Sequence, residues 1–389
     1  MSLAELCGMA LWFSASASVP VLRVQWQLDD RGAAWLTLAV QIGFVAGTLS
    51  SALFNLADVM DARRLFALSA TLGALVNAAF ALCARGLWLG LPLRFLTGVF
   101  LAGVYPPGMK LIATWFLGGR GLAIGVLIGA LTLGKASPYL INGIGDGSWR
   151  HSMLIVSVLA LCAAVIVGGL VPRGPYALPN ARFDRAQIGK VIANRGVRLA
   201  SLGYFGHMWE LYAMWTWAPV MLRASLQATG GAARMAELAA FLVIGAGALG
   251  CVAGGWLADR VGRTLVTSWA MAASGACCVL IGPLFGLPSP WLLSVAAIWG
   301  ATVVADSAQF STCVTELGDP QYLGTALTLQ TCVGFLLTTA SIELIGAIHP
   351  ALGWRYAFLV LAPGPWLGVL AMLRLRSLPE AAKLARGRR

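Results

Sequence analysis

Twelve stretches of about twenty mostly apolar residues follow one another along this 389-residue chain. A helix that spans a bilayer needs about 20 consecutive apolar residues, because the hydrocarbon core is about 30 Å thick. Only 11% of the residues are charged, whereas soluble domains contain about 25%. A water-soluble globule could not bury so much apolar surface. The sequence therefore predicts an all-α polytopic membrane protein with twelve transmembrane helices.

Short polar connections separate these stretches, which fall into two groups of six. The first group occupies residues 1–171 and the second occupies residues 199–376, and each is expected to form one bundle. A basic linker at 172–198 joins them, and a basic tail at 377–389 ends the chain. The helices are expected near 3–22, 33–56, 65–83, 87–107, 121–143, 151–171, 199–222, 237–257, 264–286, 291–313, 321–346 and 354–373.

Lysine and arginine are distributed unevenly between the two sets of connections. If the N-terminus is cytoplasmic, the connections on that side contain 18 basic residues and those on the other side contain seven. Cytoplasmic loops of membrane proteins carry such an excess. We therefore expect both termini in the cytoplasm and a multi-pass protein of a bacterial-type cytoplasmic (inner) membrane. This placement in a lipid bilayer also accounts for the net charge of +12 without nucleic acid as a partner.

The two halves repeat one another at a nearly constant spacing. An E-L-x-x-M-x-x-W pattern that begins at Glu5 recurs at Glu210, 205 residues later. A Trp-Arg pair before the sixth segment recurs before the twelfth at the same offset. The triplet L-A-D that ends at Asp58 recurs at Asp259, with an offset of 201. Many transporters are built from such repeats, and their substrate site lies near the midplane between them.

The repeat also bears on where the chain begins. Twelve residues separate Arg198 from Glu210 at the start of the seventh segment, whereas only four residues precede Glu5. We therefore expect the natural N-terminus to lie about ten to fifteen residues upstream of Met1.

The connection after the eighth segment reads GWLADRVGR at 255–263. This pattern resembles the loop signature G-x-L-a-D-R-x-G-R of the major facilitator superfamily. Its first-half copy, NLADVMDARR at 55–64, keeps the aspartate and the basic residues but lacks the glycines. In the fourth segment, Arg94-x-x-x-Gly98 resembles the R-x-x-x-G element of the family. The resemblance implies twelve helices in two six-helix bundles that work by alternating access.

A carboxylate in such a loop can pair with a nearby arginine or with the start of a helix, and breaking these pairs would let the bundles move. A turn that is merely rich in positive charge would explain the arginines but not the Gly-Asp-Gly pattern. The candidate gating residues are Asp58, Arg63, Arg94, Gly255, Asp259, Arg260, Gly262 and Arg263.

Two further stretches, WFSASA at 12–17 and VVADSAQFS at 303–311, look like parts of bacterial permeases of the nitrate, nitrite and cyanate type. Nitrate carriers of the superfamily place an arginine in the second and eighth helices. Here the second segment has Gln41 and no basic residue, and the eighth has none either, which argues against nitrate as the substrate. The Gly-Pro signature of efflux-type members is absent from the fifth segment, which argues against an exporter.

Ionisable residues at membrane depth are costly and therefore indicate functional sites. Several of them share a helix face with aromatic or amide side chains, because residues three or four apart lie on one face. By the resemblance, the first, fourth, seventh and tenth helices line the cavity, with the fifth and eleventh beside them. The candidate substrate- and proton-binding residues are Glu5, Trp12, Lys135, Tyr139, His207, Glu210, Trp217, Asp306 and Gln309.

The chemistry of these side chains suggests roles for them. A carboxylic acid in surroundings of low polarity takes up a proton more readily than it does in water. Glu210, with His207 one turn away, is the first candidate for proton coupling, and Asp306 is the second. Lys135 could meet the negative group of an anionic substrate, or it could neutralise a carboxylate in a fixed salt bridge. The tryptophans could enclose a ligand or pack in the core.

These features predict a proton-coupled secondary transporter of a small solute, with an organic or inorganic anion as one option, that acts as a monomer. ATP is not expected to drive it, because the chain has no GxxxxGK[ST] loop. Two alternatives stay open: an exporter of a drug or metabolite, and a non-transporting membrane sensor or assembly factor on this fold. The three histidines are scattered and no catalytic constellation is present, so we expect no enzymatic activity, no cofactor and no metal site.

Overall fold

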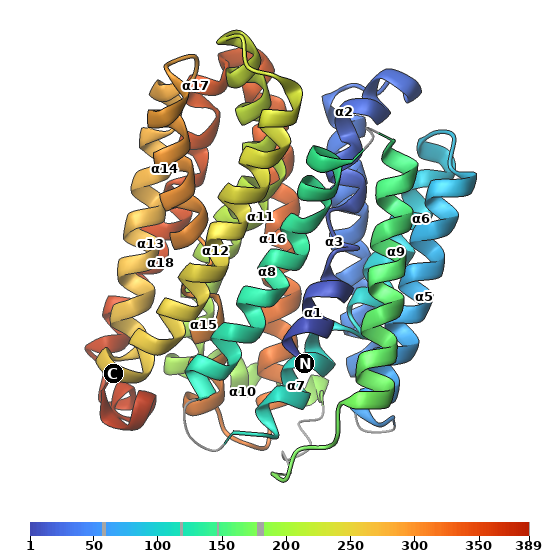
Figure 1. The fold of residues 1–389 in the computed structure, drawn as a ribbon. Helices are drawn as coiled ribbons and strands as arrows, with labels where there is room; N and C mark the ends of the chain where they lie inside the picture. Colours follow the sequence, from blue (N-terminus) through green and yellow to red (C-terminus); the bar gives the residue numbers. More distant parts are fainter. Residues whose placement is uncertain (57–59, 117–119, 146–147, 177–182, 389) are drawn as a thin grey trace.

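The computed structural model describes residues 1–56, 60–116, 120–145, 148–176 and 183–388. Helices make up nearly all of this described chain, and no strand occurs in it. Figure 1 shows two bundles side by side, with the N-terminal helices on the right and the C-terminal helices on the left. Both chain ends lie in the lower half of this view, and we call the two ends of the bundles the lower face and the upper face.

The N-terminal bundle contains six long helical stretches, of which two are interrupted. Its elements are α1 (Ser2–Met9), α2 (Ser14–Trp26), α3 (Asp30–Leu53), α5 (Ala62–Cys83), α6 (Leu87–Leu101), α7 (Tyr105–Ala113), α8 (Arg120–Ile144), α9 (Trp149–Val165) and the π-helical turn η1 (Ile166–Leu170).

A short linker and the C-terminal bundle follow. Their elements are η2 (Arg185–Gln187), α10 (Ile188–Ala193), α11 (Arg195–Ala228), α12 (Ala233–Val261), α13 (Arg263–Leu280), η3 (Gly282–Leu284), α14 (Ser289–Thr302), α15 (Ser307–Leu317), α16 (Leu323–Leu352), α17 (Trp354–Ala357), η4 (Phe358–Leu361), α18 (Pro363–Arg376) and η5 (Pro379–Gly387).

Ten helical stretches of the described chain are long and apolar enough to cross a membrane. The 34-residue α11 and the 18-residue α13 are not among these ten, and with them the described chain has twelve long helical stretches. The predicted all-α fold of two six-helix bundles is confirmed. The boundaries differ in places, since α11 begins at Arg195, four residues before the expected start at 199.

Continuous helices were predicted at several places where the structure is interrupted, and these predictions were wrong. The first helix is broken at residues 10–13, the fourth at 102–104 and the tenth at 303–306. At the fourth, Pro106 and Pro107 follow the break. Proline has no backbone N–H and cannot continue a helix from the preceding turn, so the chain must start a new one.

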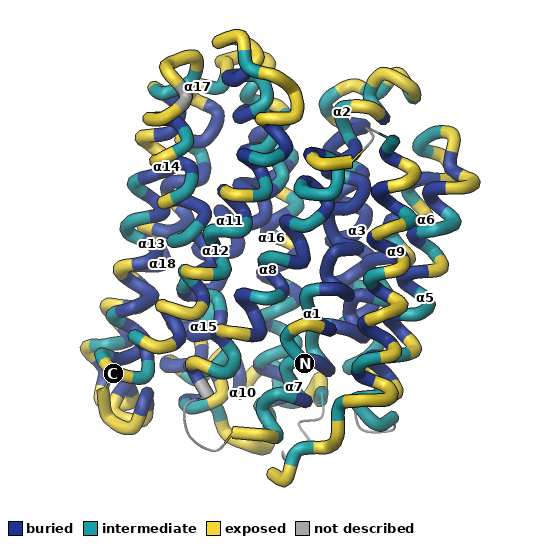
Figure 2. Tube along the Cα trace, in the orientation of Figure 1, coloured by how far each residue is buried: buried dark blue, intermediate teal, exposed yellow. Residues whose placement is uncertain are grey.

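The two bundles meet along two helix pairs, α8 with α12 and α3 with α16. Glycines bring the first pair together: a Cβ at Gly255 would lie 2.5 Å from the carbonyl oxygen of Gly121, and one at Gly125 would lie 2.6 Å from that of Cys251. No larger residue fits at this distance, and small residues are what membrane helices use for close approach. This explains Gly255 of the loop signature. Figure 2 shows buried chain concentrated where the bundles face each other.

Candidate functional site

Six aromatic side chains from both halves meet at the centre of the molecule. Phe44 and Phe335 lie with ring centroids 4.5 Å apart, and Trp12 lies 5.4 Å from Tyr212. Trp12 enters this group from the break between α1 and α2, where the chain has left the helix. All six are buried. We call them the central aromatic cluster: Trp12, Phe13, Phe44, Tyr212, Trp215 and Phe335.

Lys135 of α8 projects into the central aromatic cluster and is only 2% exposed. Its Nζ atom donates to the hydroxyl of Tyr212 at 2.5 Å. The same atom lies 4.2, 4.5 and 4.9 Å from the ring centroids of Trp12, Tyr212 and Trp215. Within the described chain no carboxylate lies within 4 Å of it. The ammonium group is therefore held by cation–π contacts across the two halves, and the alternative of a fixed salt bridge is not found there.

Arg94 of α6 stabilises the broken first helix. Its guanidinium is fully buried and donates to the carbonyl oxygen of Trp12 at 2.5 Å, to that of Leu11 at 3.2 Å and to the hydroxyl of Ser14 at 3.1 Å. A third carbonyl, that of Leu36 in α3, accepts at 3.4 Å. Backbone carbonyls that lose their helical hydrogen bonds inside a membrane need other donors, because no water is there to supply them. Arg94 therefore holds the backbone that carries Trp12 into the cluster, and the gating role predicted for it stays a prediction.

Both carboxylate oxygens of Glu210 on α11 accept hydrogen bonds from side chains of the C-terminal half. The indole N–H of Trp299 donates to its Oε1 at 2.6 Å, and the thiol of Cys278 donates to the same atom at 3.1 Å. The hydroxyl of Ser274 donates to Oε2 at 2.8 Å. The three donors lie on α13 and α14, so the contacts of Glu210 stay within its own half. The interaction with His207 that the sequence suggested is not among the contacts of Glu210.

His207 instead lies against Asp306, which stands at the break between α14 and α15. The Nδ1 atom of His207 and Oδ1 of Asp306 are 2.9 Å apart, and both side chains are 1% exposed. The Nε2 atom of His207 has no hydrogen-bond partner among the described residues. No third ligand joins this pair to make a metal site in that part of the chain.

Glu5, the repeat partner of Glu210, is fully buried, yet neither carboxylate oxygen has a hydrogen-bond partner within the described chain. The carboxylate lies against Gly108 of α7, where a Cβ would collide with Oε2. Helix α1 also touches α8: a Cβ at Gly134 would collide with the carbonyl oxygen of Leu6. Since Leu6 follows Glu5 and Gly134 precedes Lys135, the contact brings the carboxylate and the ammonium group into one region.

The remaining predicted binding residues lie away from the cluster. Tyr139 lines a cavity of about 100 Å³ nearer the upper face. Trp217 donates to the carbonyl oxygen of Ile342 at 2.9 Å and packs on the ring of His349. Gln309 accepts a hydrogen bond of 2.8 Å from Arg263 at the lower face. The structure thus brings Trp12 and Lys135 together and separates these three from them.

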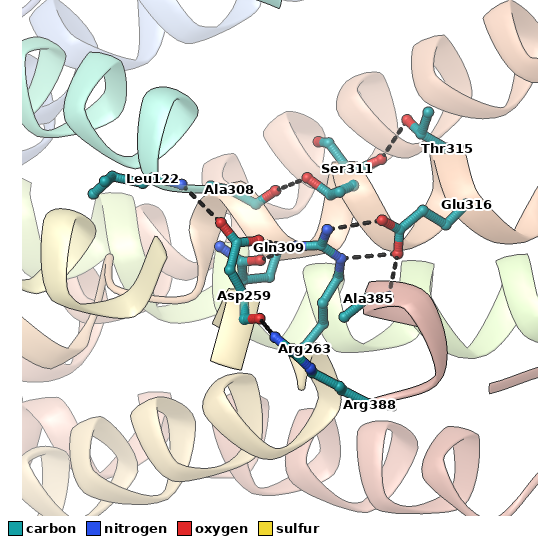
Figure 3. A network of polar contacts seen from close by, with 11 residues as sticks. Leu122, Asp259, Arg263, Ala308, Gln309, Ser311, Thr315, Glu316, Ala385 and Arg388 are labelled. Atoms are coloured by element: carbon teal, nitrogen blue, oxygen red, sulfur yellow. Dashed lines mark hydrogen bonds and ion pairs between the residues drawn. The ribbon is translucent and has the colours of Figure 1, made fainter. Parts of the chain in front are cut away.

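The loop signature forms a network of ion pairs at the lower face (Figure 3). Arg263 donates through Nε and Nη2 to the two carboxylate oxygens of Glu316 at 2.8 and 2.7 Å. Its Nη1 lies 3.8 Å from Asp259. The carboxylate of Asp259 accepts a bond of 3.3 Å from the N–H of Leu122, close to the start of α8. Asp259 therefore ties the C-terminal half to a helix N-terminus of the other half, where a negative charge is favoured.

Two other signature residues shape this loop. Gly262 has a φ angle of +104° between α12 and α13, a conformation that residues with a Cβ rarely adopt. The guanidinium carbon of Arg260 lies 3.7 Å from the ring centroid of Trp256, one turn earlier on α12. Arg260 is therefore stacked on its own helix and is not part of the network around Arg263.

The first-half copy of the signature makes different contacts. Asp58 lies outside the described residues. Arg63 donates to the carbonyl oxygens of Val167 at 3.4 Å and Gly168 at 2.8 Å. Asp61 pairs with Arg173 at 2.6 Å. Burial acts to raise the pKa of Asp61, but the backbone N–H of Arg63 and the guanidinium of Arg173 outweigh it and lower that pKa below its ordinary value.

Several residues that shape the site were not predicted from the sequence. Tyr212 and Phe335 were missed, and so were the three donors to Glu210. A signal existed for Tyr212, which lies among Trp209, Trp215 and Trp217 in the most aromatic stretch of the chain. No signal in one segment could show that Phe335 meets Phe44, because this contact joins helices of opposite halves.

The model of the Major Facilitator Superfamily matches residues 1–342 of the chain. The chain belongs to this superfamily. It is therefore a multi-pass membrane protein that transports a small solute, and not an enzyme.

Two relatives share 24% identity with the chain. A gallate transporter of Pseudomonas putida matches over 316 residues, which cover 72% of this chain and 68% of the relative. The niacin transporter NiaP of Acinetobacter baylyi matches over 279 residues, which cover 61% of each chain. The chain thus spans about two thirds of the length of these relatives.

Solved structures share the fold. A mutant of the nucleoside transporter NupG superposes with a TM-score of 0.71 at 14% identity, covering 96% of this chain and 98% of the other. The human organic anion transporter MFSD10 superposes with a TM-score of 0.67 at 15% identity, covering 95% of this chain and 96% of the other.

Proposed function

We propose that this member of the superfamily is a proton-coupled secondary transporter of small aromatic carboxylates. The observation that carries the proposal is Lys135, a buried ammonium group that is surrounded by aromatic rings of both halves and has no carboxylate within 4 Å in the described chain. A ligand bound here would touch both bundles at once, as alternating access requires.

The chemistry of this site favours a ring that carries a carboxyl group. A buried charge is costly unless it is paired, so an anion that reaches Lys135 gains a charge-assisted hydrogen bond. Aromatic rings prefer stacked or edge-to-face partners, which the side chains of the central aromatic cluster offer. Gallate and niacin, the solutes named for the two relatives, are both aromatic carboxylic acids. The relatives support the same class of substrate for this chain.

Charge balance at the site favours uptake of a proton together with the anion. Glu5 and Lys135 neutralise each other when both are ionised. A substrate carboxylate would leave one uncompensated negative charge in surroundings of low polarity, which is strongly disfavoured. Protonation of Glu5 removes that charge. We therefore assign the coupling proton to Glu5, which has no hydrogen-bond partner among the described residues, and not to Glu210, which already accepts three hydrogen bonds.

Alternating access would rock residues 1–171 against residues 199–376 around this site. The network of Asp259 and Arg263 closes the lower face. On the other face, Arg31 of α3 lies 4.0 Å from Glu343 of α16, and Asp30 lies 3.5 Å from His349. Opening either face would break its pairs. The distribution of basic residues supports a bacterial-type cytoplasmic membrane with the lower face inside, and we expect a monomer.

Ligand binding to the purified protein tests the proposal. Nicotinate and gallate are expected to raise its melting temperature, whereas nicotinamide, which has the ring of nicotinate without the charge, is expected to have no effect. Lys135→Gln should abolish the shift and Lys135→Arg should keep part of it. Lys190→Gln, in the linker helix α10, is the control for loss of a lysine elsewhere.

The outcomes separate the competing explanations. Equal shifts with nicotinamide and nicotinate, or a full shift with Lys135→Gln, would show that Lys135 does not bind the carboxylate. Proteoliposomes with an imposed pH gradient then give the direction of transport. Accumulation of nicotinate on the acidic side would identify an exporter instead of a proton symporter.

A further inference from the structure

Two cavities adjoin each other where the halves meet, at the end of α11 that leads into α12 and lies uppermost in Figure 1. Their volumes are about 100 and 360 Å³, and Arg223 and Glu237 line both. The smaller one lies between α2, α8, α11 and α12, with Tyr139 and Thr216 in its wall. The lining of neither cavity includes Lys135.

The smaller cavity lies close to Lys135. One residue of its wall on α8 and one on α11 each lie one helical turn from the site. Tyr139 follows Lys135 by four residues on α8, and Thr216 follows Tyr212 by four residues on α11. Residues four apart lie on the same face of a helix, one above the other. An anion that approaches Lys135 from the upper face therefore passes this cavity first.

The charges around the cavities suit a carboxylate. Arg23, Arg223 and Arg234 are the basic residues in their walls, and Glu237 is the acidic one. Arg223 donates to Oε1 of Glu237, whereas Oε2 of Glu237 has no partner among the described residues. A guanidinium has several N–H donors. The bond from Nη2 to Glu237 therefore leaves others free to meet an incoming anion.

We propose that these cavities form an outer binding site for the substrate carboxylate, in which Arg223 binds the anion and Glu237 is the internal carboxylate that the anion displaces. The inference rests on the proposed function, since it adds an earlier stop on the path of the same substrate. Arginine and carboxylate can form two parallel hydrogen bonds, a geometry that favours this partner. While the site is empty, Glu237 keeps the guanidinium oriented and charge-balanced.

An outer site of this kind affects rates and leaves the final affinity unchanged. The affinity at Lys135 depends only on the free and the bound states. A site that is passed on the way lowers the barrier between them, so it speeds association and dissociation together. The positive lining also raises the local concentration of anions and thereby the association rate.

Stopped-flow fluorescence of the full-length protein with nicotinate measures both quantities, because Trp12 and Trp215 lie beside Lys135. Arg223→Gln is expected to lower the association rate constant about tenfold, the loss of one charge-assisted hydrogen bond. The dissociation constant should stay within about twofold of the native value, because substitutions at distant sites usually act independently to within about that factor. Glu237→Gln should raise the association rate constant, because it removes the competing carboxylate.

Two controls keep the test decisive. Arg234→Gln removes the same charge from an exposed residue of the larger cavity, and its effect should stay below about twofold because exposed charges are screened. The double variant Arg223→Gln with Glu237→Gln leaves no unpaired charge, so it guards against misfolding and should associate as slowly as Arg223→Gln.

Each result decides the matter. Equal slowing by Arg223→Gln and Arg234→Gln would show general surface electrostatics, and a dissociation constant that rises as much as the rate falls would place Arg223 in the final site. Either outcome overturns the outer site while the proposed function stands. No response of the native protein to nicotinate or gallate would remove the proposed function and the outer site with it.

Discussion

Glu5 and Glu210 occupy equivalent positions in the two halves, 205 residues apart, and both are buried. Glu210 accepts three hydrogen bonds inside its own half. Glu5 accepts none within the described chain and lies near Lys135, a cation without a repeat counterpart, because position 340 is alanine. The C-terminal half thus holds its carboxylate with three donors, while the N-terminal half gives its carboxylate none among the described residues.

The difference arises at three positions that match at the same offset. Ser274, which donates to Glu210, has Ser69 as its counterpart, and this serine packs against Gly103. Cys278 corresponds to Gly73, which has no side chain to donate a hydrogen bond. Trp299 corresponds to Arg94, whose donors serve the carbonyls of the broken first helix. The break that brings Trp12 to the centre therefore also removes a donor from Glu5.

Trp12 and Trp217, which occupy equivalent positions in the two halves, also differ in their contacts. Trp217 stays in the continuous helix α11, where its indole N–H bonds to Ile342 and its ring packs against His349. Trp12 lies at the end of a broken helix and contacts rings of both halves. A repeat in the sequence therefore identifies equivalent positions, but the residues at those positions need not make equivalent contacts.

The largest effect on stability is expected at Arg94. Arg94→Ala removes donors from several buried carbonyls, and each carbonyl left unpaired costs free energy, so the free energy of unfolding should fall by about 3–5 kcal/mol. Its counterpart variant, Trp299→Phe, loses one bond to Glu210 and should cost about 1–3 kcal/mol. Unfolding in detergent by heat or denaturant measures both. Equal losses would show that the break in the first helix does not depend on Arg94.

The two copies of the loop signature should differ less. Arg263→Gln breaks a two-bond pair with Glu316 and should cost about 1.5–3 kcal/mol, whereas Arg63→Gln loses contacts to carbonyls near the surface and should cost about 0.5–1.5 kcal/mol. Cys313, buried on α15 beside this network, reports on opening of the lower face through its alkylation rate. The rate should rise with Arg263→Gln and stay unchanged with Arg63→Gln. The opposite order would show that the first copy of the signature, and not the second, holds the lower face closed.

The smallest effect concerns pH. The pKa of Asp61 is lower in the folded chain than in the unfolded one. The stability it contributes is therefore present at neutral pH and is lost as the pH falls below about 4. Because Arg173 is largely exposed, this contribution should stay below about 1 kcal/mol. Asp61→Asn should remove it at pH 7 and should cost progressively less as the pH falls through the lowered pKa of Asp61, and a loss of the same size at neutral and acidic pH would contradict the ion pair.

The number of helices and their division into halves could be predicted, because a spanning helix must be apolar over its whole length and this signal lies in one segment. Lys135 and Glu5 could be predicted as well, since a charge at membrane depth stands out in any apolar segment. The breaks near Trp12 and Asp306 could not, because an apolar window does not show where a carbonyl finds a donor in another helix.

Partners in the site were harder to predict than the site residues themselves. His207 and Glu210 share a helix face, which suggested an interaction between them. Each has a nearer partner on another helix, Asp306 for His207 and Trp299 for Glu210. Contacts across helices depend on how the bundle packs, and the spacing within one helix carries no information about that.

Proton uptake on ligand binding tests the central claim most directly, because it compares the two repeat-related carboxylates in one measurement. In weakly buffered solution near neutral pH, the native protein and Glu210→Gln should each take up about one proton for each nicotinate bound, as charge balance around a buried ion requires. Glu5→Gln should still bind nicotinate through Lys135 and take up none. Uptake that persists in Glu5→Gln and disappears in Glu210→Gln would contradict the account.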